Sequence, residues 1–211
     1  MKNVQNCAIL VIMQMEAVIM RLFLVRHGET DWNVERRIQG QVNIELNEFG
    51  RHLARETAKG LKDISFDLCF TSPLGRARET AEILLDGRDV PVYEEERISE
   101  MAFGEYEGGC CSKTGWNLPE EFKKFFTDPA NYKKPAGGED FYDIKKRTGD
   151  FLKELYDNEE LKDANILIST HGAALAGLLN NMKNEDISQY WGVGVHKNCA
   201  VTEVVAGEGY T

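Results

Sequence analysis

Two short apolar runs that lead into a histidine are the features that most restrict how this chain can fold. Residues 21–25 (RLFLV) end just before Arg26 and His27, and residues 165–170 (NILIST) end just before His171. Apolar runs of this length with polar boundaries are typical of buried β-strands. Weaker runs predict further strands at 66–71, 90–93 and 200–205.

Helical segments separate these strands. Between residues 48 and 61, side chains suited to one buried face recur at four-residue steps, namely Phe49, Leu53, Thr57 and Leu61. This spacing predicts an amphipathic helix with Asn47 as its N-cap. Ser72 and Pro73 are typical of the N-cap and first turn of another helix, and further helices are predicted at 139–159 and 172–180. Strands that alternate with helices indicate an α/β domain with a mostly parallel sheet, whose ligands bind beyond the carboxyl ends of the strands.

The stretch from 94 to 139 follows neither pattern. It is interrupted by Gly108-Gly109, Pro119, Pro129, Pro135 and Gly137-Gly138, and these residue types break helices and strands. We expect an inserted lid over about 94–139. A short helix is expected near 120–126, with its phenylalanines packed against the underside of the lid.

The first 19 residues are expected to lie outside the domain. Their apolar stretch is too short to span a membrane and is broken by Gln14 and Glu16. It also lacks the cleavage site of a signal peptide. We therefore predict that residues 1–19 are an extension, either disordered or a mis-assigned translation start. Residues 20–211 are predicted to form one domain.

The charge balance restricts the partners of the chain. Its 211 residues carry a formal net charge of −10, which disfavours nucleic acids and anionic membranes because both need a positive surface. Five cysteines without a C-x-x-C pair are typical of reduced thiols in the cytoplasm, not of disulfides or a zinc site. The four histidines lack metal-binding spacing, so neither a metal nor a cofactor is predicted. An anionic substrate would need positive charge concentrated in its site.

Four segments carry residues suited to phosphate chemistry. They are 26–33 (RHGETDWN), 72–81 (SPLGRARETA), 100–108 (EMAFGEYEG) and 170–172 (THG). Together they strongly resemble the histidine phosphatase superfamily, also called the phosphoglycerate-mutase-like family, over nearly all of 21–205. The resemblance implies a three-layer, doubly wound α/β sandwich with helices on both faces of the sheet.

The resemblance also implies a role for each motif residue. His27 matches the nucleophile that becomes phosphohistidine. Arg26 and Arg76 match the arginines that clamp the phosphate, with His171 as their partner, and Glu100 matches the proton donor. Asn33 matches a position that contacts the phosphoryl group. Further candidates for phosphate or substrate contacts are Thr30, Gln39, Gly40 and Gly172.

These residue types suit the hydrolysis of a phosphate ester on physical grounds as well. A neutral imidazole is not repelled by the charged ester, and water can cleave the phosphoramidate that it forms. Guanidinium groups provide paired donors for phosphoryl oxygens, and a carboxylic acid can protonate the poor alkoxide leaving group. Gly28 and Gly172 are expected to let backbone N–H groups approach the phosphate. The predicted partner is therefore a small phosphate ester.

Each assignment has a structural alternative. A histidine at a strand end, taken alone, is more often structural, and Arg76 and Arg78 could form a solvated helix face. Glu100 lies in an acidic neighbourhood, where a solvated carboxylate is the default. Glu105 and Glu107 are its rivals as the acid. The joint pattern of motifs favours the catalytic interpretation.

The resemblance favours a phosphatase over a mutase. Gln39-Gly40 resembles the phosphatase branch, whereas mutases usually have T-G-W at this point. No arginine occurs between Arg97 and Arg147, where mutases have an arginine pair for bisphosphoglycerate. The alternatives are a cofactor-dependent phosphoglycerate mutase and a catalytically inactive phosphate-binding module. The sequence leaves the individual substrate and the oligomeric state open.

Overall fold

The computed structural model describes residues 19–192 and 194–206, and the predicted extension at 1–19 therefore lies almost entirely outside the described residues. None of the helices in the described part is long and apolar enough to cross a membrane. In chain order the elements are β1 (Met20–Arg26), α1 (Asp31–Val34), α2 (Glu48–Gly60), β2 (Leu68–Thr71), α3 (Gly75–Leu85), β3 (Val92–Glu94), α4 (Lys124–Thr127), α5 (Phe141–Asp157), β4 (Asn165–Thr170), α6 (Gly172–Met182) and β5 (Val201–Ala206).

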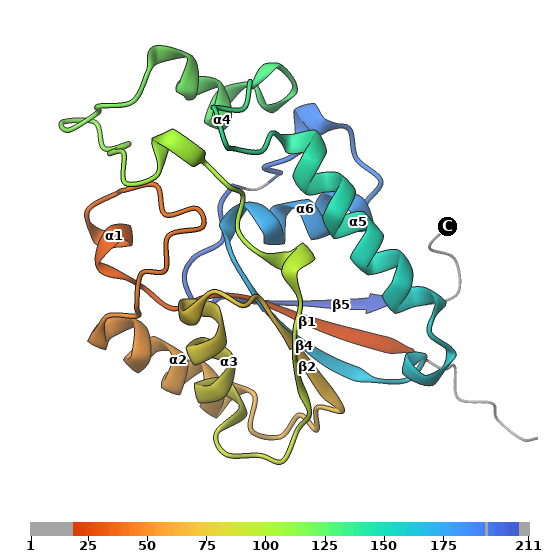
Figure 1. The fold of residues 1–211 in the computed structure, drawn as a ribbon. Helices are drawn as coiled ribbons and strands as arrows, with labels where there is room; N and C mark the ends of the chain where they lie inside the picture. The colour runs from red at the N-terminus through yellow and green to blue at the C-terminus, as the bar shows by residue number, and fades with distance from the viewer. Residues whose placement is uncertain (1–18, 193, 207–211) are drawn as a thin grey trace, which may run out of the picture.

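The strands form one sheet in the order β3-β2-β4-β1-β5. The pairs β2–β3, β2–β4 and β1–β4 are parallel, and the edge strand β5 runs antiparallel to β1 (Figure 1). In the register of the central pair, Arg26 lies opposite Thr170. The predicted mostly parallel sheet is confirmed, and both histidine motifs leave it at the same edge.

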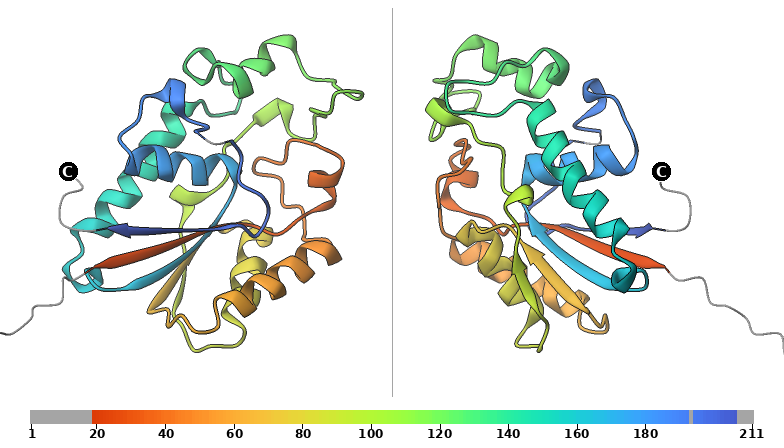
Figure 2. Two further views of the ribbon diagram at one scale, coloured as in Figure 1. Left: turned by 180° about the vertical axis from the view of Figure 1, so that it is seen from behind. Right: turned by 45° about the vertical axis from the view of Figure 1, so that its right-hand side comes forward.

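Helices cover both faces of the sheet, as the views in Figure 2 show. On one face, α2 and α3 pack over Phe23, Val25 and Leu167. On the other face, α5 and α6 pack over Leu22, Leu24 and the other strand residues whose side chains point to that face. Successive residues of β1 thus serve opposite cores, which is why its whole run is apolar. The predicted three-layer, doubly wound architecture is confirmed.

Two local expectations were wrong. The predicted amphipathic helix is present and Leu61 at its end is buried, but the expected face is only partly right. The buried residues within α2 are Gly50, Ala54 and Ala58, while Phe49 is exposed. The reason is a close approach, because a Cβ on Gly50 would lie 2.2 Å from the backbone oxygen of Glu29. Asn47 does cap α2 by accepting from Gly50 N at 2.8 Å.

The second error concerns Ser72. Helix α3 begins at Gly75, and its N-cap Leu74 provides no side-chain hydrogen bond. The Ser72 hydroxyl lies 2.7 Å from the His171 ring instead. The residue that resembled a helix cap in the sequence therefore contacts His171, one of the predicted site residues.

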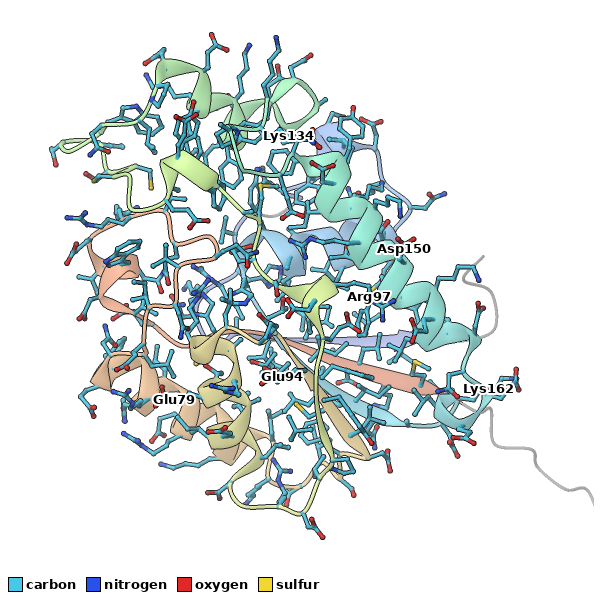
Figure 3. The ribbon with its side chains drawn as sticks, viewed as in Figure 1. Glu79, Glu94, Arg97, Lys134, Asp150 and Lys162 are labelled. Carbon is cyan, nitrogen blue, oxygen red and sulfur yellow. The ribbon has the colours of Figure 1, made fainter. Side chains whose placement is uncertain are left out.

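The segment between β3 and α5 covers the carboxyl edge of the sheet. It includes α4 and encloses an aromatic cluster around Phe122 and Phe125, which packs against α5 and α6. Ion pairs join both of its ends to α5: Arg97 with Glu154, Lys134 with Asp143, and Glu139 with Arg147 (Arg97 and Lys134 are labelled in Figure 3). The predicted helix near 120–126 corresponds to a 3-10 turn at Glu120–Lys123 followed by α4.

Candidate active site

His27 and His171 lie side by side at the carboxyl edge of the sheet. Each directly follows one of the two central strands, and His27 N donates to Thr170 O at 2.8 Å. Their ring centroids are 5.2 Å apart, with the ring planes at 54°. The sheet register therefore holds two buried imidazoles next to each other.

The hydrogen bonding of His27 defines its tautomer. Nδ1 lies 2.7 Å from Gly28 O, and a carbonyl can only accept, so Nδ1 carries the proton. Burial, reinforced by the charges of Arg76 and Arg26, holds the pKa of His27 well below its usual value of 6.5. The ring is thus neutral at physiological pH, and Nε2 carries a free lone pair. This is the form that a nitrogen nucleophile requires.

His171 has one satisfied and one unsatisfied nitrogen. Nε2 lies 2.7 Å from Ser72 Oγ, whereas the buried Nδ1 has no hydrogen-bond partner among the described residues. Burial and the nearby Arg76 and His27 hold the pKa of His171 well below 6.5 as well. A neutral ring with an unused nitrogen is available to a bound group.

Arg26 and Arg76 are anchored by the far ends of their guanidinium groups. Arg26 Nη1 donates to His196 O at 2.6 Å, and the two Nη atoms of Arg76 donate to Val42 O and Gly40 O at 2.8 and 2.7 Å. Burial lowers the pKa of Arg76 to about 10, so it remains charged at neutral pH. In both arginines the buried Nε has no partner within the described part of the chain.

Glu100 is held by the first turn of α6. Its Oε1 accepts from Ala173 N at 3.0 Å and from Ala174 N at 3.2 Å. His171, the N-cap residue of α6, makes no capping bond of its own, so a carboxylate from the first part of the lid fulfils this role. The Glu100 backbone oxygen accepts from Gln41 Nε2 and Arg147 Nη2 at 2.6 and 3.2 Å.

The two rival carboxylates are engaged elsewhere. Glu107 Oε1 accepts from Gln41 N and Phe103 N at 2.9 and 3.1 Å, and Glu105 Oε1 accepts from Ala136 N at 3.4 Å. Neither lines the cavity of the site, whereas Glu29 and Glu100 do. The geometry favours Glu100 over Glu105 and Glu107 as the acid.

Asn33 lines the cavity and its amide has a defined orientation. Its Oδ1 accepts from Thr30 N at 3.1 Å and from Asn198 Nδ2 at 3.3 Å, so the Asn33 NH₂ group points away from these donors. Thr30 is fully buried and forms the N-cap of α1 with Asn33. Because Thr30 does not line the cavity, the geometry gives no support to its predicted contact with the phosphate.

Gly28 and Gly172 were both expected to let the backbone approach a phosphate, and only Gly172 lines the cavity. Gly172 lines the cavity, and a Cβ there would lie 3.6 Å from Glu100 Oε2 and 3.7 Å from Arg26 Nε, in the space of the site. Gly28 does not serve a ligand, because its N–H donates to Thr80 Oγ1 at 2.9 Å. A Cβ on Gly28 would lie 2.9 Å from Gly50 O, so this glycine permits the close packing of α2.

These residues surround a cavity of about 650 Å³ beneath the lid. Of the predicted site residues, the cavity lining includes Arg26, His27, Asn33, Gln39, Gly40, Arg76, Glu100 and Gly172. Two predicted residues, His171 and Thr30, are fully buried and are not part of this lining; His171 reaches the site only as the neighbour of the His27 ring. The lid and its neighbours add an aromatic wall, with Trp32, Phe103, Phe125, Phe126 and Trp191. The expected local concentration of positive charge is present within a chain of net charge −10.

Sequence reasoning gave little weight to His196 in the loop before β5, and it missed Lys197 and the turn after α1. His196, Lys197 and Asn198 line the cavity, as do Arg36 and Arg37. Asn198 Nδ2 donates to His27 O at 2.9 Å and to Gly28 O at 3.2 Å, and so steadies the carbonyl that orients the His27 ring. The antiparallel pairing of β5 with β1 brings this loop to His27. Among the residues that the structure describes, no group of three or more histidine, cysteine or carboxylate side chains could hold a metal ion.

Comparison with known proteins agrees with this arrangement. The chain is 37% identical over 164 residues to the uncharacterized phosphatase PhoE of Bacillus subtilis, covering 77% of each chain. It is 32% identical to the 2,3-bisphosphoglycerate-dependent phosphoglycerate mutase 2 of Gloeobacter violaceus, covering 75% of this chain and 73% of the mutase. The solved structure of Bacillus stearothermophilus YhfR superposes with a TM-score of 0.80 at 35% identity, covering 90% of this chain and 97% of YhfR.

The family assignment rests on nearly the whole domain. The model of the histidine phosphatase superfamily (branch 1) matches residues 22–211, which include most of β1, the lid and both histidine motifs. The chain therefore belongs to branch 1 of the histidine phosphatase superfamily.

Proposed function

We propose that the chain hydrolyses phosphate monoesters of small metabolites, without a metal ion, through a phosphohistidine at His27. One observation carries the proposal. Three buried nitrogens, Arg26 Nε, Arg76 Nε and His171 Nδ1, lack partners within the described residues and belong to side chains around the His27 ring. Unpaired buried donors are costly, so their grouping indicates a site built for an anion with several acceptor oxygens.

In the first step His27 Nε2 attacks phosphorus while the bond from phosphorus to the alcohol oxygen breaks. The Nδ1 proton remains on its bond to Gly28 O, which stabilises the positive charge that the phosphorylated ring acquires. The two arginines stabilise the charge on the equatorial oxygens, the main requirement of phosphoryl transfer. His171 Nδ1–H and the NH₂ group of Asn33 are the further donors that we assign to these oxygens.

Glu100 is the residue that we assign to proton transfer. As a carboxylic acid it protonates the departing alcohol oxygen, and as a carboxylate it then takes a proton from the water that attacks phospho-His27. The bond between phosphorus and Nε2 breaks, which releases inorganic phosphate and restores the neutral ring. The bonds from Ala173 N and Ala174 N to Oε1 support this role, because they orient the carboxyl group and leave Oε2 less engaged.

The remaining predicted residues of the cavity lining, Gln39, Gly40 and Gly172, are assigned to shaping the phosphate site. Gln39 and Gly40 line the cavity. Gly40 O accepts a hydrogen bond from Arg76 Nη2, so this turn holds the arginine in place. Gly172 keeps open the space between Glu100 and Arg26. We assign these residues to positioning the phosphate and not to proton transfer.

The test is the phosphoenzyme. Wild-type protein incubated briefly with a ³²P-labelled monoester should carry an acid-labile, base-stable phosphate, and His27→Ala should lose both this label and turnover. His52→Ala is the matched control, because His52 is an exposed histidine of α2 outside the cavity. Label that persists in His27→Ala, or that maps to another residue in the wild type, would overturn the proposal.

A further inference from the structure

The cavity carries more positive charge than one phosphate requires. Five cationic side chains line it: Arg26, Arg36, Arg37, Arg76 and Lys197. Arg26 and Arg76 belong to the proposed phosphate site. Arg37 forms an ion pair with Glu35, donates to Gly108 O and stacks on Trp32, so its charge is largely engaged.

The side chains of Arg36 and Lys197, unlike that of Arg37, have no partner for their charge among the described residues. Within residues 19–192 and 194–206, the side chain of neither forms a hydrogen bond or an ion pair. Two carboxylates also line the cavity, but both have other partners: Glu29 accepts from Asn47 Nδ2 and Glu100 from the start of α6. Two exposed cations on the cavity wall therefore lack a counter-charge in a chain that is strongly acidic overall.

The backbone at Arg36 makes this residue unusual. Arg36 has φ 56°, in the left-handed region that favours glycine. Arg36 N donates to Asn33 O and Arg37 N donates to Trp32 O, which is the hydrogen-bond pattern of a Schellman motif with Arg36 at C′. Cys111 N donates to Arg36 O at 2.9 Å and holds the turn from the other side. A glycine would fit this position better, so the turn itself gives no reason for an arginine.

The size of the cavity leaves room for a second group. At about 650 Å³ it lies in the usual range for small-molecule sites, roughly 300–1,000 Å³. We propose that Arg36 and Lys197 form a second anion subsite, and that the substrate is a phosphate ester whose alcohol carries another anionic group. This inference rests on the proposed function, since it concerns the leaving-group side of the same site.

Two nearly isosteric esters test the subsite. In 4-carboxyphenyl phosphate the leaving group carries a carboxylate, and in 4-carbamoylphenyl phosphate it carries a neutral amide. Each kcat/KM is measured in wild type, Arg36→Gly, Arg36→Lys and Lys197→Gln. We expect Arg36→Gly to lower the ratio of carboxylate to amide ester by about tenfold, the scale of one charge-assisted hydrogen bond. Arg36→Lys should restore part of the ratio, and Lys197→Gln should lower it.

Arg55→Gln is the matched control. Arg55 is an exposed cation of α2 outside the cavity, so its loss changes the net charge equally and should leave the ratio unchanged. The midpoint of thermal unfolding of Arg36→Gly should not fall, because glycine suits the left-handed turn. If Arg36→Gly lowers both esters equally, or the Arg55→Gln ratio falls as far, the subsite is refuted.

Failure of hydrolysis would be distinguishable from failure of the subsite. If the wild type releases phosphate from neither ester, the proposed function fails, and calorimetric titration with the intact esters then measures the subsite directly. Tighter binding of 4-carboxyphenyl phosphate that is lost in Arg36→Gly supports the subsite. Equal affinity for the two esters overturns it.

Discussion

The Ser72 hydroxyl lies 2.7 Å from Nε2 of His171, and both residues are fully buried. If His171 Nδ1–H donates to the phosphoryl group, Nε2 must accept, and Ser72 must be the donor. Ser72 is then a positioning residue that selects the tautomer of His171. The hydroxyl accepts Leu74 N–H at 3.3 Å, and its own proton has two acceptors within reach: the ring nitrogen at 2.7 Å and Ser99 Oγ at 3.5 Å, of which the ring is the closer.

Ser72→Ala should therefore lower kcat/KM by roughly tenfold, the scale of one lost hydrogen bond to a developing charge. The tautomer is the decisive measurement: ¹⁵N NMR should find His171 protonated on Nδ1 in the wild type and a mixture in Ser72→Ala. Ser72→Thr keeps the hydroxyl and should retain the wild-type spectrum. An unchanged tautomer in Ser72→Ala would mean that the serine acts only in packing.

Burial of His27 and His171 should make stability depend on pH. Their pKa values are held well below 6.5 in the native state, whereas in the unfolded chain they return to about that value. Below pH 6.5 the unfolded chain thus binds protons that the native state does not. The free energy of unfolding should fall by up to about 1.4 kcal/mol per pH unit for each histidine as the pH drops.

The contribution of His27 can be isolated by substitution. Asparagine can place an amide donor near Gly28 O without a titratable ring, so His27→Asn should reduce this slope by up to about 1.4 kcal/mol per pH unit. Denaturant titrations of both proteins at pH 7.0, 6.0 and 5.0 supply the slopes. Parallel slopes would show that His27 titrates normally in the folded protein.

Glu100→Gln should slow phosphoenzyme formation from an alkyl phosphate by roughly 10²–10⁴-fold, because an alkoxide needs a proton to depart. With p-nitrophenyl phosphate the same step should slow far less, since nitrophenolate is stable at neutral pH. Dephosphorylation then becomes limiting, and a burst of nitrophenol should appear in rapid-quench measurements.

Glu29 gives a sharper control for Glu100 than its sequence neighbours. It is the other carboxylate of the cavity lining, and Glu29→Gln should affect both substrates about equally. Glu105→Gln tests an acid outside the cavity and should behave in the same way. Equal losses on the two substrates for Glu100→Gln would assign proton transfer to another group.

Metal removal should leave activity intact. The proposed chemistry uses an imidazole nucleophile and guanidinium donors, so treatment with EDTA followed by gel filtration should not change kcat. Restoration of a lost activity by Mg²⁺ or Zn²⁺ would contradict the mechanism.

Isomerase activity should be slow at best. Residues 98–146 contain no arginine to hold a bisphosphoglycerate from the lid side. With 3-phosphoglycerate and 2,3-bisphosphoglycerate supplied together, phosphate release should be at least as fast as isomer interconversion. Interconversion that greatly outpaces phosphate release would identify a mutase instead.

Strands β1 and β4 were predictable because their apolar runs serve two cores at once. The predicted strand at 165–170 coincides with β4, and the histidines that follow β1 and β4 meet as expected. The buried face of α2 was not predictable, since the helix packs by its smallest residues and exposes Phe49. Hydrophobic spacing carries no information on such close backbone contact.

The candidate site was predictable where motifs follow strands and was not where loops supply side chains. Arg26, His27, Arg76 and Glu100 line one cavity, as their motifs implied. Asn198 lies in a loop without periodicity and reaches His27 only through the antiparallel pairing of β5. Recognising 200–205 as an antiparallel edge strand would have directed attention to the loop before it.

The parallel register of β1 and β4 limits which changes in length this chain can tolerate. Side chains alternate along a strand, so one residue inserted before Arg26 or Thr170 would turn His27 or His171 toward the opposite face. Beyond Ile98 and Glu100, the lid carries no such constraint, because its aromatic cluster is separate from the two clusters that cover the sheet. Insertions and deletions can therefore accumulate between β3 and α5 without separating the two imidazoles, and a lineage of such chains can change its substrates by altering the length of one segment.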